Sequence, residues 1–265
     1  MPRPALALVL AVALGACATS GERFDTAASL DRAAEDPWEK TNRKVHAFNS
    51  EVDRLVVRPP SALYQKAVPA PLQRGVRNFY GNLGEPLNFV NALAQGQIES
   101  ARRAAGRFLI NVALGGIGVA DEATLLGLDE QPHDLGQTFA VWGIKSGPFV
   151  MMPVFGPTTV RDGLGFLGEL FLDPVRFGTG AALNSTQSVI EQGVRLLDQR
   201  AELIERGEQI RRGSADDYAT VRSAWLQLRL AQLYNGDPPI SDEDYEDFDD
   251  EPLDAPTAAP DDATP

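Results

Sequence analysis

The sequence predicts a mainly α fold, with many helices of modest length and at most one β-hairpin. Apolar residues recur at helical spacing in several segments between residues 36 and 236. The 24 Gly and 19 Pro residues of the chain interrupt these segments and predict frequent turns. No internal repeat of solenoid period is present. The chain of 265 residues is therefore expected to form one good-sized helical domain with tails.

The first predicted helix extends from Asp36 to about Val56. Asp36 as N-cap, Pro37 at the first helical position and Glu39 at the third form an arrangement that satisfies free N–H groups at a helix start. The apolar stripe of this helix consists of Trp38, Val45, Phe48, Val52 and Leu55. The two prolines that follow Arg58 are expected to end it.

Four helices are expected next, separated by Pro- and Gly-containing breaks at residues 69–71 and 84–86. They cover residues 61–66, 72–83, 87–96 and 97–113. The last of them carries Arg102, Arg103 and Arg107 on or near its polar side. We interpret these arginines as a solvated helix face; contact with lipid phosphates is the alternative.

A glycine-rich turn, with Gly115, Gly116 and Gly118, ends this helical region. A short helical segment at residues 121–126 follows it. We expect the turn to be flexible and to let a neighbouring segment move.

The stretch from Asp134 to Pro174 is apolar, carries few charges and is broken repeatedly by Gly and Pro. These interruptions exclude one long helix and predict a short helix, a hairpin-like piece and a second helix. The seven residues 149–155 are far short of the roughly 20 needed to span a bilayer. Two interpretations stay open: the stretch lies in lipid without crossing it, or it forms the core of a soluble domain.

Three helices are expected in the C-terminal part. Thr158 or Thr159 caps the first, which ends near residue 173. Two longer helices cover about residues 184–206 and 214–233, and Ser214 with Asp217 forms a capping-box-like pair at the start of the last one. Gly236 is expected to close the domain.

Charge is distributed unevenly along the chain. The formal net charge is −13, but 12 of the 37 acidic residues lie from Asp237 onward, where Lys and Arg are absent. Residues 1–236 therefore carry 25 acidic and 24 basic residues and are nearly neutral. Such a body has no basic excess to attract nucleic acid. Residues 237–265 are expected to be a disordered acidic tail, either simply solvated or docked on a basic partner.

The N-terminus indicates export and lipidation. A short apolar run after Arg3 has the length of a signal-peptide core, and Leu14-Gly15-Ala16-Cys17 resembles the bacterial lipobox. Cys17 is the only cysteine, so it has no partner for a disulfide within the chain. We expect residues 1–16 to be a lipoprotein signal peptide and residues 17–35 to be a lipidated Cys17 with a flexible tether. The alternative is a signal peptide that contains a cysteine by chance.

Signatures of the common enzyme classes are missing from the sequence. It lacks a G-x-S-x-G elbow, an H-E-x-x-H zinc motif and a phosphate-binding G-x-x-x-x-G-K motif. No catalytic residue, metal or cofactor is therefore predicted. His133 beside Asp134 has two interpretations: a base with its orienting carboxylate, or a cap for the following helix. We favour the cap because no motif places a nucleophile.

With these residues in hand, the chain resembles the VacJ/MlaA family of outer-membrane lipoproteins. The resemblance covers about residues 36–236 in order and without large gaps, and leaves out the tether and the acidic tail. The segments that carry it are 36–39 (DPWE), 42–43, 57–59, 68–71, 78–83 (NFYGNL), 85–86, 107–111, 136–139, 143–144, 147–149, 153–157 (PVFGP) and 159–162, with a weak match over 218–236.

The resemblance implies a ring-like array of helices in the inner leaflet of the outer membrane. Such a ring surrounds an amphipathic channel that passes mislocalised phospholipid from the outer leaflet to a soluble periplasmic carrier. It further implies association with an outer-membrane porin trimer. Under this reading we expect five residues of the stretch from Asp134 to Pro174 to face lipid tails or the lipid path: Trp142, Phe149, Met151, Met152 and Phe155. A lipoprotein hydrolase and a porin-associated structural lipoprotein are the alternatives.

Overall fold

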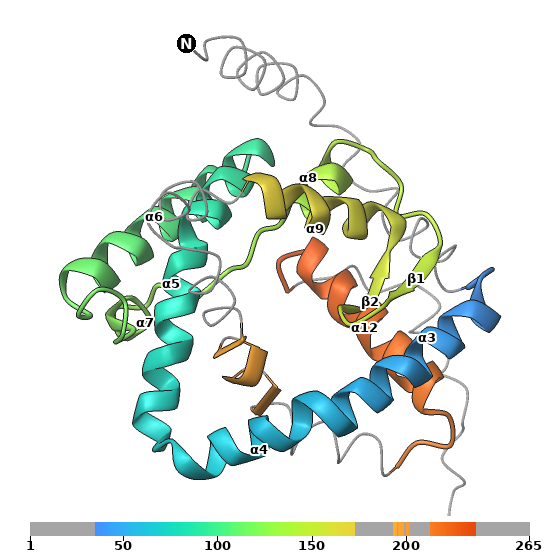
Figure 1. Cartoon of the computed structure of the whole chain (residues 1–265). Coiled ribbons are helices and arrows are strands. Elements are labelled where there is room, and N and C mark those ends of the chain that lie inside the picture. Colours follow the sequence, from blue (N-terminus) through green and yellow to red (C-terminus); the bar gives the residue numbers. More distant parts are fainter. Residues whose placement is uncertain (1–34, 173–192, 195, 199, 202–212, 237–265) are drawn as a thin grey trace, which may run out of the picture.

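The computed structural model describes residues 35–172, 193–194, 196–198, 200–201 and 213–236. Its elements follow one another around a ring, and the C-terminal helix lies beside the hairpin on one side of it (Figure 1). Helices dominate and one two-stranded antiparallel sheet accompanies them, so the mainly α prediction is confirmed. The predicted signal peptide, Cys17, tether and acidic tail lie outside the described residues, as does most of the helix predicted over residues 184–206.

The first side of the ring is one long helical arc. It consists of α3 (Glu39–Val52), the π-helical turn η2 (Asp53–Val57) and α4 (Arg58–Ala67). The break predicted after Arg58 is wrong: η2 leads directly into α4, and the two prolines lie in the first turn of that helix. The break at residues 69–71 is confirmed: Val68, which precedes a proline, has an extended backbone and ends α4.

The next two helices pack against each other. They are α5 (Ala70–Ala94) and α6 (Ile98–Ala113). The break predicted at residues 84–86 is wrong, since α5 continues through Pro86. That proline removes a single backbone hydrogen bond, while the neighbouring Glu85 is buried and ion-paired with Arg107 of α6. This tertiary contact favours a continuous helix where the sequence pattern indicates a stop.

The stretch from Asp134 onward folds in the predicted order. After α7 (Glu122–Leu125) come α8 (Leu135–Val141), β1 (Phe149–Met152), β2 (Gly156–Thr159) and α9 (Val160–Leu172). The strands pair with Phe149 opposite Thr159. Asp134 and Gln137 form a capping box at the start of α8, and Thr159 Oγ1 accepts the Asp162 N–H at 3.3 Å. Both predicted caps are therefore confirmed.

Two other predicted caps are wrong. Helix α12 (Asp217–Leu233) is capped by Asp216, whereas the Ser214 hydroxyl bonds to Thr220. Asp36 is buried with a φ of 43° and accepts hydrogen bonds from Asn42 and Tyr218, so it does not cap α3. Gly236 follows the end of α12 with a φ of 91°, and its N–H donates to the Ala231 carbonyl at 2.8 Å. That the domain ends there stays a prediction.

The distribution of polarity is inverted relative to an ordinary soluble domain. Among the described residues, 20 polar or charged residues are buried against nine hydrophobic ones, whereas 26 large hydrophobic side chains are exposed. The apolar core is a small cluster of Phe149, Met151 and Tyr218, against which Trp225 packs. Within the described part of the chain, the helices are too short or too polar to cross a membrane. Polar side-chain networks therefore supply much of what holds the elements together.

Two asparagines of α3 hold the hairpin by its backbone. The Asn42 amide donates to the Phe149 carbonyl at 3.1 Å and accepts the Met151 N–H at 3.0 Å. Two helical turns further along, Asn49 donates to the Met152 carbonyl at 2.9 Å and accepts the Val154 N–H at 2.7 Å. Each asparagine amide thus provides a partner for one backbone N–H and one backbone carbonyl at the edge of the hairpin. At other sheet edges an adjacent strand would bind these groups.

We expect Asn42→Ala to lower the free energy of unfolding by about 2–3 kcal/mol, because it leaves a buried carbonyl and a buried N–H without partners. The measurement is urea unfolding of the full chain in detergent, followed by circular dichroism. Lys44→Ala on the same helix removes an exposed side chain and is the control, with a change within about 0.5 kcal/mol. Equal effects of the two substitutions would show that the asparagine does not hold the strand.

Candidate functional site

Helix α12 closes the ring through charged contacts at both of its ends. At its N-terminal end, Arg43 of α3 binds Asp216 through two hydrogen bonds of 3.0 and 2.6 Å. This pairing lowers the pKa of Asp216 to about 2. His46 of α3 lies 3.0 Å from Asp217. In the C-terminal half of α12 a buried arginine, Arg229, makes the charged contacts.

Arg229 connects α12 to both helices that flank the hairpin. Its guanidinium binds Asp134, the N-cap of α8, at 2.5 and 2.9 Å, and Asp162 of α9 at 2.9 and 3.0 Å. Burial alone would raise the pKa of Asp162, but the charges and hydrogen bonds of Arg229 and Arg161 outweigh it and lower that pKa. Asp162 and Arg229 therefore stay ionised although both are buried.

Glycines allow α8 and α9 to approach closely enough for this cluster to form. A Cβ at Gly165 would lie 2.5 Å from the backbone nitrogen of Gly136. A Cβ at Gly136 would lie 2.6 Å from Asp162 Oδ1 and 2.7 Å from Arg229 Nη2. A larger residue at either position would thus displace backbone or the ion cluster.

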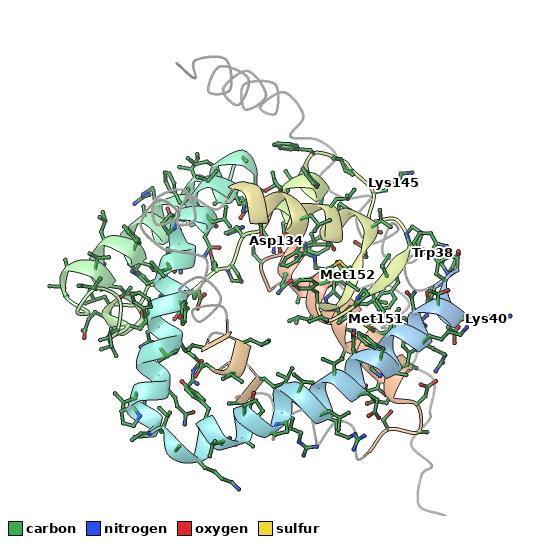
Figure 2. The ribbon with its side chains drawn as sticks, in the orientation of Figure 1. Trp38, Lys40, Asp134, Lys145, Met151 and Met152 are labelled. Atoms are coloured by element: carbon green, nitrogen blue, oxygen red, sulfur yellow. The ribbon has the colours of Figure 1, made fainter. Side chains whose placement is uncertain are left out.

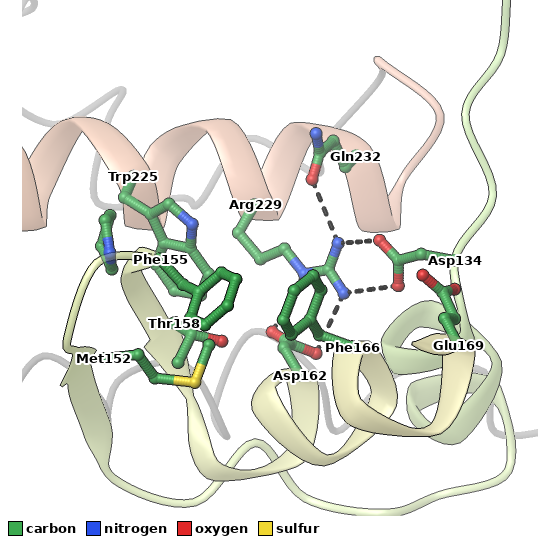
Figure 3. Close-up of a pocket in the computed structure, with 11 residues that line it drawn as sticks. Asp134, Met152, Phe155, Thr158, Asp162, Phe166, Glu169, Trp225, Arg229 and Gln232 are labelled. Carbon is green, nitrogen blue, oxygen red and sulfur yellow. Dashed lines mark hydrogen bonds and ion pairs between the residues drawn. The ribbon is translucent and has the colours of Figure 1, made fainter. Parts of the chain in front are cut away.

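A cavity of about 220 Å³ lies beside this cluster (Figure 3). Polar residues line it at one end and apolar or aromatic residues at the other, and they come from the α8 N-cap, the hairpin, α9 and α12. The lining residues used below are Asp134, Met152, Phe155, Asp162, Phe166, Glu169, Trp225, Arg229 and Gln232. Asp134 and Met152 lie toward the inside of the ring, whereas Lys40 and Lys145 point away from it (Figure 2).

Glu169 is the acidic lining residue that has no arginine partner in the described structure. Its Oε1 accepts the Leu135 N–H at 2.6 Å and an Asn91 N–H at 3.3 Å. Burial raises the pKa of Glu169, and the nearby charge of Asp134 acts in the same direction. Glu169 lies on the same face of α9 as Asp162 and Phe166. Phe166 follows Asp162 by four residues, and Glu169 follows Phe166 by three.

His133 lies in a buried polar network next to this site and does not contact Asp134 as a catalytic pair would. Its Nδ1 is 2.9 Å from Gln95 Oε1, and its backbone carbonyl accepts from Asn91 at 3.1 Å. The Asp134 carboxylate instead binds Arg229 and caps α8. The base-and-carboxylate hypothesis is therefore wrong in geometry. Within the described ranges, no three His, Cys, Asp or Glu side chains are grouped to hold a metal ion.

The five residues predicted to face lipid divide into two groups. Phe149 and Met151 are buried against Tyr218, so their predicted place at a lipid surface is wrong; alternation along β1 turns them into the core. Met152 is half-buried and Phe155 is 64% exposed, and both line the cavity. Trp142 is 39% exposed, and its Nε1 donates to the Ala94 carbonyl. Lipid contact by Trp142, Met152 and Phe155 stays a prediction.

Two of the three glycines of the predicted flexible turn, Gly115 and Gly118, lie in tight spaces. A Cβ at Gly115 would lie 2.2 Å from the Ala120 carbonyl oxygen, and one at Gly118 would lie 2.7 Å from the Asn82 side chain. Gly116 and Gly118 have positive φ angles of 62° and 88°. Close packing and backbone conformation explain these glycines, and movement of the turn stays a prediction.

The three arginines of α6 do not share one face. Arg102 is exposed and pairs with Glu99, as expected of a solvated face. Arg107 is buried, ion-paired with Glu85 and bonded to the Leu128 carbonyl, so its predicted place on that face is wrong. Arg107 follows Arg103 by four residues, which predicts a shared helix face. The burial of Arg107 depends on Glu85 from another helix, and the local sequence does not show that contact.

Exposed apolar side chains continue from α6 through the glycine turn into α7. Leu125 at 80% and Ile117 at 71% are the most exposed of them. The full set is Leu109, Val112, Leu114, Ile117, Val119, Leu125 and Leu126; we call it the α6–α7 apolar face. Large apolar side chains exposed in this number along one segment indicate contact with lipid or with another protein.

Comparison with known proteins places these features in a family. The family model described as MlaA lipoprotein matches residues 34–232. The intermembrane phospholipid transport system lipoprotein MlaA of Escherichia coli is 33% identical over 227 residues, covering 84% of this chain and 85% of that protein. The protein of the same name from Haemophilus influenzae is 30% identical, covering 87% and 90%.

A solved structure described as "Structural basis for maintenance of bacterial outer membrane lipid asymmetry" has the same fold. It aligns with a TM-score of 0.64 and 29% sequence identity. The match covers 76% of this chain and 99% of the other.

We expect Gly165→Ala to lower the free energy of unfolding by about 1–3 kcal/mol, because the added methyl group would meet the Gly136 backbone. Gly84→Ala is the matched control: it lies inside α5 and its added Cβ would meet nothing within 4 Å. That control should raise the free energy of unfolding by about 0.4–1 kcal/mol. Urea unfolding of both variants checks the prediction, and a neutral Gly165→Ala would contradict the close helix contact.

We expect His133 to make stability fall as pH decreases. Burial lowers the pKa of His133, so below about pH 6.5 the unfolded chain binds a proton that the native chain does not bind. His133→Asn should therefore lose less free energy of unfolding than the wild type between about pH 7.5 and about pH 6. His46→Asn, at the only other histidine, is the control. In this variant the loss of free energy of unfolding that His133 causes as pH falls should remain. Equal pH slopes for the wild type and His133→Asn would refute this assignment.

Proposed function

Because the chain belongs to the MlaA lipoprotein family, we propose that it removes mislocalised phospholipid from the outer leaflet of the outer membrane and passes it to a soluble periplasmic carrier. The observation that carries this proposal is the inverted polarity of a ring-shaped fold: polar residues are buried between its elements, and large apolar residues are exposed. The relatives named for intermembrane phospholipid transport support it.

The physical requirement for such transport is a path with two kinds of surface. A phospholipid headgroup needs polar contacts, and its acyl chains need apolar ones, since an uncompensated polar group in hydrocarbon costs several kcal/mol. The cavity beside Arg229 offers both surfaces over a short distance, with carboxylates at one end and Met152, Phe155 and Trp225 at the other. We propose that the lipid path runs along the inner side of the ring past this cavity.

The α6–α7 apolar face supports a position within one leaflet. Its leucines and valines would bury apolar area in acyl chains, at about 25 cal/mol per Å² removed from water. Acylated Cys17 would hold the protein at the membrane, because more than one acyl chain gives firm anchoring. We propose that the anchor and this face together keep the ring in the inner leaflet of the outer membrane, facing the periplasm.

The proposed partners follow from this placement. A protein held in one leaflet reaches the other through a neighbour, and we propose an outer-membrane porin trimer for that role. The carrier is a soluble periplasmic lipid-binding protein. The family is one of transport lipoproteins and not a known enzyme family. Lipid movement through the ring is passive in this proposal, and its direction is set by the partners.

The cellular test measures phospholipid exposed in the outer leaflet of the outer membrane in cells that lack the gene. We expect exposure to rise on deletion and to return to normal with a wild-type copy but not with Cys17→Ala, which removes the anchor. Immunoblotting of the Cys17→Ala protein controls for its amount. Unchanged exposure on deletion would refute the proposed function.

The α6–α7 apolar face is tested with Leu125→Asp and Leu126→Asp together. Both side chains are exposed, so we expect folding to survive with a change of about 0.5 kcal/mol or less per site. Charges on this face should weaken binding of the unlipidated protein to phospholipid vesicles at least tenfold in a flotation assay, since each would enter hydrocarbon. Leu228→Asp on α12 is the exposed control. Equal flotation of all variants would place membrane contact elsewhere.

A further inference from the structure

We propose that the cavity between α9, α12 and the hairpin binds the primary ammonium group of an ethanolamine phospholipid headgroup, with Glu169 as its carboxylate partner. This inference rests on the proposed function and assigns a headgroup class to it. The cavity is polar at one end and aromatic at the other, and both ends border the same space (Figure 3).

Charge balance around the cavity selects a cation. Arg229 binds Asp134 and Asp162, and Arg161 binds the same Asp162 carboxylate at 2.9 Å. Two arginines therefore offset two aspartates. Glu169 remains, and when it is ionised the cluster carries one uncompensated negative charge. The ammonium of a zwitterionic headgroup would offset it, whereas a headgroup without a cation would leave it uncompensated.

The geometry of Glu169 leaves one acceptor for this ligand. Its Oε1 is fixed by the Leu135 N–H and by Asn91. Within the described part of the chain, no hydrogen-bond donor contacts Oε2 of this cavity-lining side chain. Burial raises the pKa of Glu169, so a bare carboxylate there is costly. A primary ammonium would donate to Oε2 and stabilise the ionised form.

The opposite wall suits an ammonium group with its adjoining carbons. Phe155 and Phe166 form a ring pair with centroids 5.0 Å apart, and Trp225 lines the same space. Aromatic faces attract organic cations and also cover apolar carbon. A metal ion fits less well, because the described residues contain no group of three His, Cys, Asp or Glu side chains arranged to hold one.

The size of the cavity restricts the ligand further. Pockets for drug-sized molecules measure about 300–1000 Å³, whereas this cavity measures about 220 Å³. It would hold a headgroup and leave the acyl chains outside the cavity. Headgroup recognition here is therefore compatible with passage of the rest of the lipid along the ring.

The test measures which lipids the full-length lipidated protein retains. It is equilibrated in mixed micelles that contain equal amounts of phosphatidylethanolamine, phosphatidylcholine and phosphatidylglycerol of identical acyl chains, and the bound lipids are quantified by mass spectrometry. We expect phosphatidylethanolamine to be enriched over both others. Glu169→Gln should reduce this enrichment by about tenfold, since it removes a charge-assisted hydrogen bond.

Two matched measurements make the result decisive. Glu169→Gln keeps an oxygen for the Leu135 N–H, so its unfolding midpoint should stay close to that of the wild type. Glu130→Gln removes the same charge from an exposed side chain outside the cavity and should leave the enrichment unchanged. Phosphatidylcholine has no N–H to donate, so its equal retention would overturn the hydrogen bond to Glu169.

Failure of the inference is distinguishable from failure of the proposed function. Retention of phospholipid without headgroup preference, or a preference that survives Glu169→Gln, would overturn the ammonium site while leaving lipid transport standing. Failure to retain any phospholipid above the level of an unrelated lipoprotein would overturn both.

Discussion

The ring depends on one buried arginine that is shared by two aspartates. Arg229 lies on the last helix of the described chain, and its partners belong to the N-cap of α8 and the first turn of α9. Removing one partner of such a buried cluster typically costs about 3–5 kcal/mol, because the remaining charge stays buried and unpaired. The same contact gives the cavity its charged end. Closure of the ring and formation of the candidate lipid site therefore rest on the same atoms.

The inverted distribution of polarity explains why such clusters are needed. A fold that exposes its large apolar side chains cannot rely on a hydrophobic core, and here that core is reduced to a few residues around Phe149. Asparagine amides, side-chain caps and ion pairs connect the elements instead. In water this arrangement would leave much apolar surface uncovered, whereas beside acyl chains the exposed surface is satisfied. The interior network then fixes the shape of the ring.

Much of the fold was predictable from local sequence signals, and much of the site was not. Helical periodicity and turn residues gave the helix–hairpin–helix order after Asp134 and the caps at Asp134 and Thr159. The continuity of α5 through Pro86 depends on Arg107 from another helix, which no local pattern reveals. Phe149 and Met151 looked like lipid-facing residues because apolar composition does not tell a core from a membrane surface.

Asp162, Glu169 and Arg229 were missed for the same reason: their partners come from other helices. A signal was nonetheless present, since Asp162, Phe166 and Glu169 recur at helical spacing on one face of an otherwise apolar helix.

The most direct measurement of the central claim is photo-crosslinking of phospholipid inside the ring. A photoreactive amino acid is placed at position 155, which lines the cavity, and at position 40, whose side chain points away from the ring. Cells are labelled with phosphate isotope, irradiated, and the purified protein is tested for attached lipid. The claim predicts lipid adducts at position 155 and few at position 40. Absence of adducts at position 155, with adducts at position 40, would contradict a lipid path along the inner side of the ring.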